Sequence, residues 1–151
     1  MIRKANIQDA PAIQQLIISN AKRGLMLNRS LNSVYDYLRD FWVYTDKDNK
    51  ILGCAALHII GWDALAEVKS LSVSDDAQNK GIGKSLVNEC ITEAKTFGIT
   101  KVFALTYVPD FFNKCGFDRI DMNTLPHKIW SDCIDCPSYG NCNEIAVMRS
   151  I

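Results

Sequence analysis

Apolar and polar residues alternate along this chain with two different periods, one typical of strands and the other of helices. Strand-like runs are predicted at FWVYTD, ILGCAALHII, LAEVKSLSV and EIAVMRSI, with shorter ones at residues 2–5 and 101–106. The polar turn KDNK between the first two runs predicts an antiparallel hairpin. In LAEVKSLSV, a period of two places four residues on one face: Glu67, Lys69, Leu71 and Val73.

Helical spacing occurs between these runs. Asp9 is the expected cap of a first helix, and Ser30 is the expected cap of a second, SLNSVYDYLRD. A third helix is predicted from Gly83 to about Phe97, and Pro109 begins a short fourth that Gly116 ends. The apolar stripes of the first three helices are Ile13, Leu16 and Ile17, then Leu31, Val34, Tyr35 and Leu38, then Leu86, Val87, Cys90, Ile91 and Ala94. Helices alternating with hairpins predict an α/β fold whose sheet is only partly parallel.

Length and charge narrow the class of protein. A chain of 151 residues with 48% hydrophobic residues is expected to form one domain, residues 1–151. Seventeen basic and seventeen acidic residues cancel, so no net positive field favours nucleic acid or an acidic membrane surface. The first residues, MIRKANIQDAP, lack the apolar core of a signal peptide, and no apolar run has transmembrane length. We therefore expect a cytoplasmic protein without nucleic-acid or membrane partners.

The six cysteines fall into two groups. Three lie in apolar stretches, where a free thiol behaves as a small hydrophobic side chain: Cys54, Cys90 and Cys115. The others cluster near the C-terminus and, with His127, offer four ligands of the types that zinc prefers: Cys133, Cys136 and Cys142. Only the first pair has the favourable C-x2-C spacing, and packed thiols or a redox pair suit the pattern equally well. We predict no metal.

The stretch QNKGIGKS connects a predicted strand to a predicted helix. A P-loop would need glycine at Gln78, and a dinucleotide-binding turn would need glycine at Leu86. A helix N-terminus nevertheless offers unpaired N–H groups to an anion, and Lys80 and Lys84 add positive charge. A glycine turn with solvated lysines explains the spacing equally well, so these residues alone do not identify a phosphate.

A more specific resemblance covers most of the chain between residues 65 and 117. SLSVSDDAQNKGIGKSLV resembles the acetyl-coenzyme A loop of the GNAT acetyltransferases, [QR]-x-x-G-x-[GA], with matches at Gln78, Gly81 and Gly83. FFNKCGF is similar to the family element F-[YF]-x-x-x-G-F. The resemblance implies a single-domain GNAT fold with a mixed, splayed central sheet flanked by helices, and acetyl-coenzyme A as co-substrate. The residues that it implicates in coenzyme binding are Leu71, Ser72, Val73, Gln78, Asn79, Lys80, Gly81, Ile82, Gly83, Lys84, Ser85 and Phe112.

A narrower resemblance lies partly outside this core. GLMLNRS, AEVKSLSV, LTYVPDFFNKCGF and KIWSDCIDCPSYGNCNEIAV are similar to the short N-acetylglutamate synthases of arginine biosynthesis. Here Asn28 stands where that group usually has proline, and Lys69 stands where arginine is common. The resemblance implies acetyl transfer to the α-amino group of an amino acid, with L-glutamate as the best-supported substrate. A homodimer is a common assembly in the family.

Acetyl transfer to an amine needs a proton acceptor, a site for an oxyanion and a proton for the leaving thiolate. Glu67 is a candidate base, although an ion pair with Lys69 explains it equally well. Phe112 replaces the tyrosine that serves many family members as acid, which leaves Tyr107 as the nearest hydroxyl, or simply as a half-buried aromatic residue. Arg29 and Lys69 are the candidate partners of substrate carboxylates.

Other functions remain open. His58 lies in an apolar strand and is expected to be a hydrogen-bonded core residue. Acetylation of another small amine or of a peptide N-terminus would use the same loop. The absence of the family tyrosine favours a non-catalytic acyl-coenzyme A sensor, and the cysteine-rich tail favours a zinc-stabilised interaction domain.

Overall fold

The computed structural model describes residues 1–125 and 144–151. These residues form a mixed sheet in the order β1-β2-β3-β4-β5-β7-β6. Only the β4–β5 pair is parallel, and the other pairs are antiparallel. The strands are β1 (Ile2–Lys4), β2 (Phe41–Thr45), β3 (Ile51–Ile60), β4 (Leu65–Val73), β5 (Lys101–Thr106), β6 (Asp118–Arg119) and β7 (Ile145–Ser150). The predicted α/β fold with a partly parallel sheet is confirmed.

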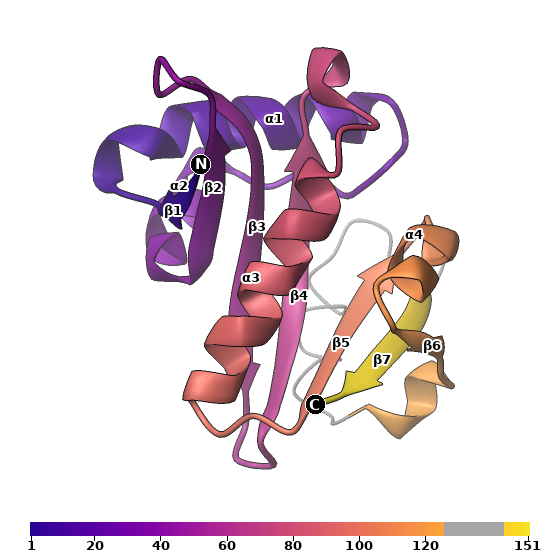
Figure 1. The fold of residues 1–151 in the computed structure, drawn as a ribbon. Helices are drawn as coiled ribbons and strands as arrows, with labels where there is room; N and C mark the ends of the chain where they lie inside the picture. Colours follow the sequence, from indigo (N-terminus) through magenta and orange to yellow (C-terminus); the bar gives the residue numbers. More distant parts are fainter. Residues whose placement is uncertain (126–143) are drawn as a thin grey trace.

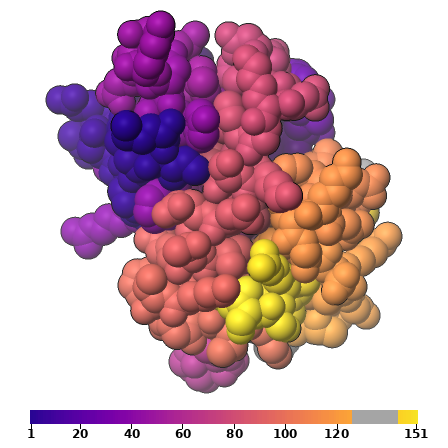
Figure 2. Space-filling view, viewed as in Figure 1, coloured from indigo at the N-terminus to yellow at the C-terminus, as the bar shows by residue number. Residues whose placement is uncertain are grey.

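Helices cover both faces of this sheet (Figure 1). On one face lies α3, and on the other lie α1 and α2, while α4 sits beside β6 and β7. In the space-filling view, α3 separates the N-terminal segments from the C-terminal strand β7 (Figure 2). The helices are α1 (Ala10–Lys22), α2 (Leu31–Asp36), α3 (Ile82–Thr96) and α4 (Pro109–Lys114), with single 3₁₀ turns at Ile7–Asp9, Leu38–Asp40, Asp75–Ala77 and Met122–Thr124.

The core lies on both sides of the sheet. The predicted stripe of α3 is fully buried against Ala55, Leu57, Ala66 and Val68, as the helical spacing required. On the opposite face, α1 buries Ile13 and Ile17 against β2 and β3. The thiol of Cys54 belongs to this second cluster, and burial raises its pKa to about 12, so it is neutral and packs as an apolar group. Within the described part of the chain, every helix is too short or too polar to cross a bilayer.

The two parallel strands at the centre of the sheet separate along their length. Pairing between β4 and β5 is limited to residues Leu65, Ala66 and Glu67 against Lys101, Val102 and Phe103. Beyond Glu67, β4 continues to Val73 alongside β3 only, and β5 continues alongside β7. Figure 1 shows the two strands diverging toward the end of the sheet where α3 begins. This divergence leaves main-chain groups of both strands without a strand partner.

A β-bulge in β4 changes which side chains share a face. Cys54 pairs with Ser72 and Ala56 pairs with Lys69, so β4 contains one extra residue between these two positions. Ser70 within the bulge has a φ of 57°, which is uncommon for a residue other than glycine. Leu71 therefore packs with the α3 cluster, whereas Lys69 lies on the opposite face. The predicted single face of Glu67, Lys69, Leu71 and Val73 is wrong, because the period of two is interrupted at the bulge.

Two details near the N-terminus also differ from the prediction. Asp9 occupies the cap position of α1 but makes no capping hydrogen bond, because its carboxylate accepts from Asn6 N–H and pairs with Arg3. Ser30 does cap α2, by accepting from Ser33 N–H at 3.0 Å. The stretch that follows breaks into a six-residue helix and a 3₁₀ turn, so Tyr35 faces outward with 39% of its surface exposed.

Candidate active site

The loop between β4 and α3 is fixed to the end of β4. The side-chain amide of Gln78 donates to Val73 O at 2.8 Å, which ties the loop to the strand. Asn79 and Gly81 both have positive φ, 63° and 77°, so the chain turns sharply before the helix. Glycine adopts this conformation at little cost, and an added Cβ on Gly81 would meet nothing within 4 Å. The matched glycine thus serves the backbone turn and leaves the space above it open.

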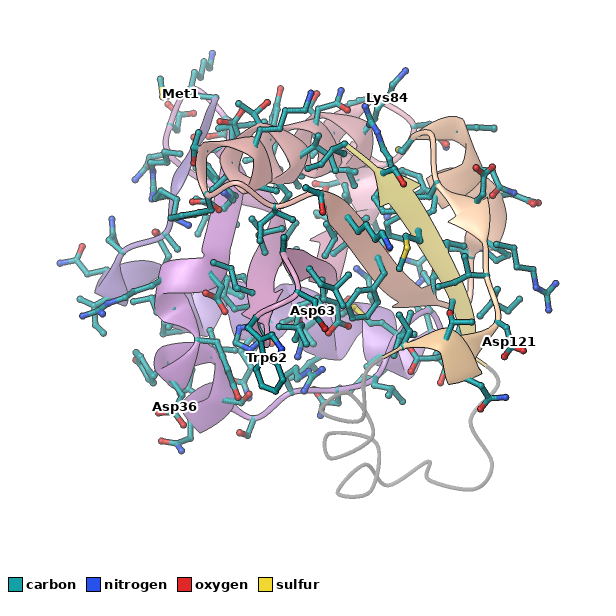
Figure 3. The ribbon with its side chains drawn as sticks, turned by 90° about the horizontal axis from the view of Figure 1, so that it is seen from below. Met1, Asp36, Trp62, Asp63, Lys84 and Asp121 are labelled. Atoms are coloured by element: carbon teal, nitrogen blue, oxygen red, sulfur yellow. The ribbon has the colours of Figure 1, made fainter. Side chains whose placement is uncertain are left out.

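The first turn of α3 follows directly. Ile82 begins the helix, so the N–H groups of its first turn have no partners within the helix and form an anion-binding end. Lys84 projects away from this turn (Figure 3). Gly83 has a different role, because a Cβ there would lie 3.2 Å from the ring of Phe111. Its small size lets α4 approach the start of α3.

The end of β4 offers only some of the groups expected to meet a coenzyme. Ser72 is 2% exposed, and its hydroxyl donates to Leu16 O and contacts Asn20 of α1. Ser74 N–H donates to Leu52 of β3, so by alternation the main-chain groups of Leu71 and Val73 point away from β3, toward the gap beside β5. Since Val73 O accepts from Gln78, the groups left for a ligand are those of Leu71 and the Val73 N–H. The Ser72 hydroxyl is directed toward α1, and a coenzyme contact of this residue stays a prediction.

The aromatic residues after β5 lie at the same end of the sheet. Phe112 is 4% exposed and packs edge-on against Phe111 and Phe117, so it belongs to the core and offers little surface to a ligand. Tyr107 is half-buried and follows the last residue of β5. Thr106 accepts from Val108 N–H at 2.9 Å and shapes the turn that leads into α4. The hydroxyl expected to serve as acid is therefore carried by a turn at the widening gap.

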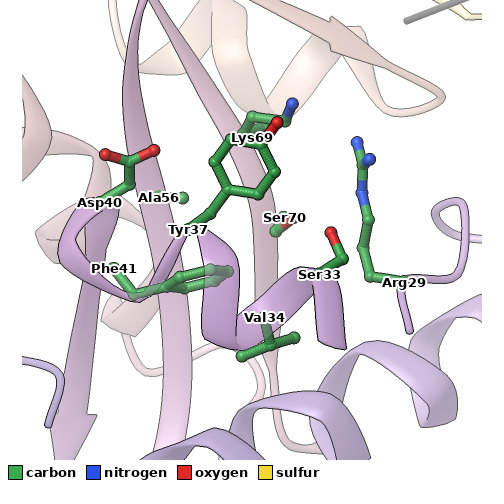
Figure 4. Close-up of a pocket in the computed structure, with 9 residues that line it drawn as sticks. All are labelled: Arg29, Ser33, Val34, Tyr37, Asp40, Phe41, Ala56, Lys69 and Ser70. Atoms are coloured by element: carbon green, nitrogen blue, oxygen red, sulfur yellow. The ribbon is translucent and has the colours of Figure 1, made fainter. Parts of the chain in front are cut away.

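A pocket on the α2 side of the sheet contains both predicted carboxylate partners. Arg29 enters it from the segment before α2, and Lys69 enters it from β4 (Figure 4). In the described part of the chain, the Arg29 guanidinium has no ion pair. The pocket is lined by Arg29, Ser33, Val34, Tyr37, Asp40, Phe41, Ala56, Lys69 and Ser70. Two residues distant in sequence thus present positive charge to one space.

Glu67 lies on the same sheet face as this pocket. Its carboxylate is 4.0 Å from the Lys69 ammonium, and its side chain is only 10% exposed. Directly across on β3 is His58, the register partner of Glu67. The imidazole Nδ1 of His58 is 2.7 Å from the carboxylate of Asp40. His58 is hydrogen-bonded as expected, but its side chain is 29% exposed, so it borders the pocket region and is not a core residue.

Several pocket residues were not predicted from the sequence. Tyr37 and Asp40 were assigned only to a helical stretch, because a continuous helix would have distributed them around its surface. The break after Asp36 turns both residues toward β3 and β4 instead. The only sequence signal for these two residues was the charged stretch DYLRD before a strand. This stretch does not indicate which way their side chains face. The four residues weighed as zinc-ligand candidates, for which no metal is predicted, lie outside the described residues: His127, Cys133, Cys136 and Cys142.

Comparisons with known proteins agree with this geometry. Residues 19–117 match the acetyltransferase (GNAT) family. An uncharacterised N-acetyltransferase of Chlorobaculum tepidum is 36% identical over 150 residues, covering 99% of this chain and 96% of that protein. An amino-acid acetyltransferase of Mycobacterium tuberculosis is 30% identical over 141 residues, covering 92% of this chain and 79% of that protein.

A solved structure extends the comparison. N-acetylglutamate synthase from Neisseria gonorrhoeae, complexed with coenzyme A and N-acetyl-glutamate, superimposes with a TM-score of 0.89 at 30% identity. The match covers 99% of this chain but 34% of the synthase chain, so this chain corresponds to about a third of that protein. The family match spans well over half of the sequence, and the splayed sheet and strand-to-helix loop are those that the motifs implied. The chain belongs to the GNAT acetyltransferase family.

Proposed function

We propose that this protein transfers the acetyl group of acetyl-coenzyme A to the α-amino group of L-glutamate. The observation that carries the proposal is the meeting of Arg29 and Lys69 in one pocket, on the sheet face that also carries Glu67. A substrate with two carboxylates needs two positive partners, and its amine needs a proton acceptor nearby. The similarity to amino-acid acetyltransferases and to N-acetylglutamate synthase supports the same substrate class.

The coenzyme would occupy the gap between β4 and β5. Its pyrophosphate would meet the N–H groups of residues 79–84, where the positive φ of Gly81 exposes the backbone. Lys80 and Lys84 would add charge, and Ile82 and Ser85 would contribute through the backbone and hydroxyl of the first helical turn. The pantetheine arm would extend along Leu71 and Val73, whose free main-chain groups suit an amide chain. This path would bring the thioester to the β4 bulge.

The reaction would then proceed by direct attack. Glu67 would take a proton from the substrate ammonium, directly or through water, and the neutral nitrogen would attack the acetyl carbonyl carbon. A C–N bond forms, and the resulting oxyanion would accept a hydrogen bond from Leu71 N–H. The C–S bond then breaks and expels the thiolate, to which Tyr107 would give a proton. The nitrogen would lose its second proton to solvent, and solvent would reprotonate Tyr107 and take the proton held by Glu67. The products are the N-acetyl amino acid and coenzyme A.

The thiolate needs little help to leave. A thiol has an ordinary pKa of about 8.5, so protonation near neutral pH is favourable without a strong acid. A weak donor such as the Tyr107 hydroxyl therefore suffices, and the replacement of the family tyrosine by Phe112 does not exclude catalysis.

A non-catalytic acyl-coenzyme A-binding domain is the second candidate. One observation favours it, because the buried Phe112 carries no hydroxyl at the position where many relatives place their acid. Such a domain would bind acetyl-coenzyme A through the same loop but would release no thiol on addition of an amine.

One experiment separates the candidates. Thiol release from acetyl-coenzyme A is followed after addition of L-glutamate, L-glutamine, L-aspartate, L-lysine, L-arginine or a short peptide with a free N-terminus. The proposal predicts fastest release with glutamate. Thiol release with the peptide or another amine in place of glutamate would identify that compound as the substrate. Coenzyme binding without any thiol release would support the non-catalytic binding domain.

A further inference from the structure

Tyr37 contacts the lysine of the proposed carboxylate pocket. Its ring centroid is 5.6 Å from the Lys69 ammonium, within the range of a cation–π contact. Tyr37 lies between α2 and the 3₁₀ turn Leu38–Asp40, while Lys69 lies on β4, so the contact joins the helical layer to the sheet. In Figure 4 the aromatic ring overlies the lysine side chain at the mouth of the pocket.

Tyr37 is itself held from another direction. The His58 ring meets it edge-on, with centroids 5.1 Å apart and the ring planes at 90°. His58 is fixed in turn by its contact with Asp40, 2.7 Å from Nδ1 to the carboxylate oxygen. Asp40 follows Tyr37 by one turn of 3₁₀ helix and is linked to it by a hydrogen bond from Asp40 N–H to Tyr37 O, 2.9 Å long. The aromatic ring is therefore anchored through both its own backbone and its neighbour.

A lysine at position 69 depends on a contact such as the Tyr37 ring to fix its charge more than an arginine would. A lysine ammonium is a single charge on a flexible four-carbon stem, and fixing it costs side-chain entropy. Here the stem is largely buried, since 13% of the Lys69 side chain is exposed. The ammonium is 4.0 Å from the Glu67 carboxylate and lies over Tyr37. The ring contact therefore opposes the pull of the Glu67 carboxylate on the ammonium.

We propose that Tyr37 is a positioning residue that holds the Lys69 ammonium toward the pocket, where it receives a substrate carboxylate. The inference rests on the proposed function for its substrate, and it adds a specificity-determining side chain from the α2 layer. His58 and Asp40 act one step further away by fixing the Tyr37 ring. The hydroxyl of Tyr37 takes no part, because a cation–π contact uses the face of the ring.

Three variants test the proposal. Tyr37→Phe keeps the ring, Tyr37→Leu removes it, and Lys69→Met removes the charge while keeping the stem. Tyr35→Leu is the matched control, because Tyr35 is similarly exposed on α2 and does not line the pocket. Tyr37→Leu should raise KM for glutamate about three- to tenfold, the range of a moderate cation–π contact. In Tyr37→Phe and Tyr35→Leu, KM for glutamate should stay near that of the parent protein. KM for acetyl-coenzyme A should not change in any of these Tyr variants.

A double-mutant cycle separates positioning from a general structural effect. In the Lys69→Met background, Tyr37→Leu should raise KM for glutamate no further, because its effect passes through the lysine. An equal rise in both backgrounds would overturn the proposal. Melting temperatures of all variants are measured alongside, and His58→Ala should shift KM in the same direction by a smaller factor.

A readout without substrate completes the test. In the parent protein and in Tyr37→Phe, the NMR signals of the Lys69 Cε protons should be displaced upfield by the aromatic ring, and Tyr37→Leu should remove the displacement. Absence of the displacement in the parent protein would overturn the positioning role. If the displacement is present but no amino acid is acetylated, the proposed function fails, and with it the receiving role of Lys69.

Discussion

Glu67 faces Phe103 at the last position where β4 and β5 are paired. The candidate base therefore sits where the central gap of the sheet begins to open. On one side of it is the pocket that contains Arg29 and Lys69, and beyond it β4 continues without pairing to β5. An amine held in the pocket and a thioester held in the gap would meet beside this carboxylate.

Replacing Glu67 by glutamine should slow the chemical step. Glu67→Gln keeps the shape and removes the proton acceptor, so kcat should fall by about 10²- to 10⁴-fold. Raising the pH should recover part of the loss, because more substrate amine is then neutral without assistance. Steady-state kinetics across pH provide the measurement.

Glu93→Gln is the control for this change. Glu93 is also a largely buried carboxylate beside a lysine, but it bonds Lys4 and Trp42 on the α3 side of the sheet. Its variant should lower stability without lowering kcat. A Glu67→Gln enzyme with unchanged kcat at every pH would leave Glu67 as an ion-pair partner of Lys69 only.

Gly81 gives a test of the coenzyme loop. Gly81→Ala places a side chain on a residue with φ of 77°, which costs roughly 1–2 kcal/mol and distorts the turn. Acetyl-coenzyme A binding measured by calorimetry should weaken about tenfold or more, roughly the loss of one hydrogen bond to a charged group.

Gly98→Ala is the matched control for the loop. Gly98 has φ of 75°, an exposed position and no atom near its Cβ site, but it lies at the opposite end of α3. Both variants should lose similar stability, and only Gly81→Ala should lose coenzyme affinity. Equal affinities in the two variants would argue against the loop as the phosphate site.

Much of the fold could be predicted because local signals and burial agree. The stripe of α3, the hairpin of β2 and β3 and the bounds of β4 all follow from apolar runs of helical or strand period that end at polar residues or glycine. The bulge at Ser70 could not be predicted, because an extra residue without glycine leaves no composition signal. Nor could the strand β6, whose two residues, Asp118 and Arg119, carry no apolar pattern.

The candidate site was predicted only in part, and from motif resemblance instead of periodicity. Arg29 and Lys69 were identified through motif resemblance, and the fold brings them into one pocket. Tyr37 was missed because its place depends on where α2 stops, and helix ends are weakly encoded. The direction of the Ser72 hydroxyl, which the bulge turns toward α1, was not foreseen either. Tertiary geometry, not residue type, decided these positions.

Acid stability should report on the Arg3–Asp9 pair at the start of α1. The hydrogen bond from Arg3 lowers the pKa of the Asp9 carboxyl, assisted by Asn6 N–H. A lowered pKa in the native state stabilises the fold above the ordinary carboxyl pKa of about 3.9, and this contribution is lost as pH falls through the native value. Asp9→Asn should therefore lower the urea midpoint at pH 7. Between pH 5 and pH 2 the midpoint of this variant should fall less than that of the parent protein. A parallel shift at every pH would contradict this.

The preference for glutamate over glutamine tests the pocket most directly. The ratio of kcat/KM for the two substrates is measured in the parent protein, in Arg29→Ala and in Arg39→Ala, which removes an exposed arginine outside the pocket. One charge-assisted hydrogen bond contributes roughly 1.5–3 kcal/mol, so the parent protein should prefer glutamate about ten- to a hundredfold. Arg29→Ala should raise KM for glutamate and flatten the ratio, while Arg39→Ala should preserve it. A parent protein that acetylates glutamate and glutamine equally well would contradict the account.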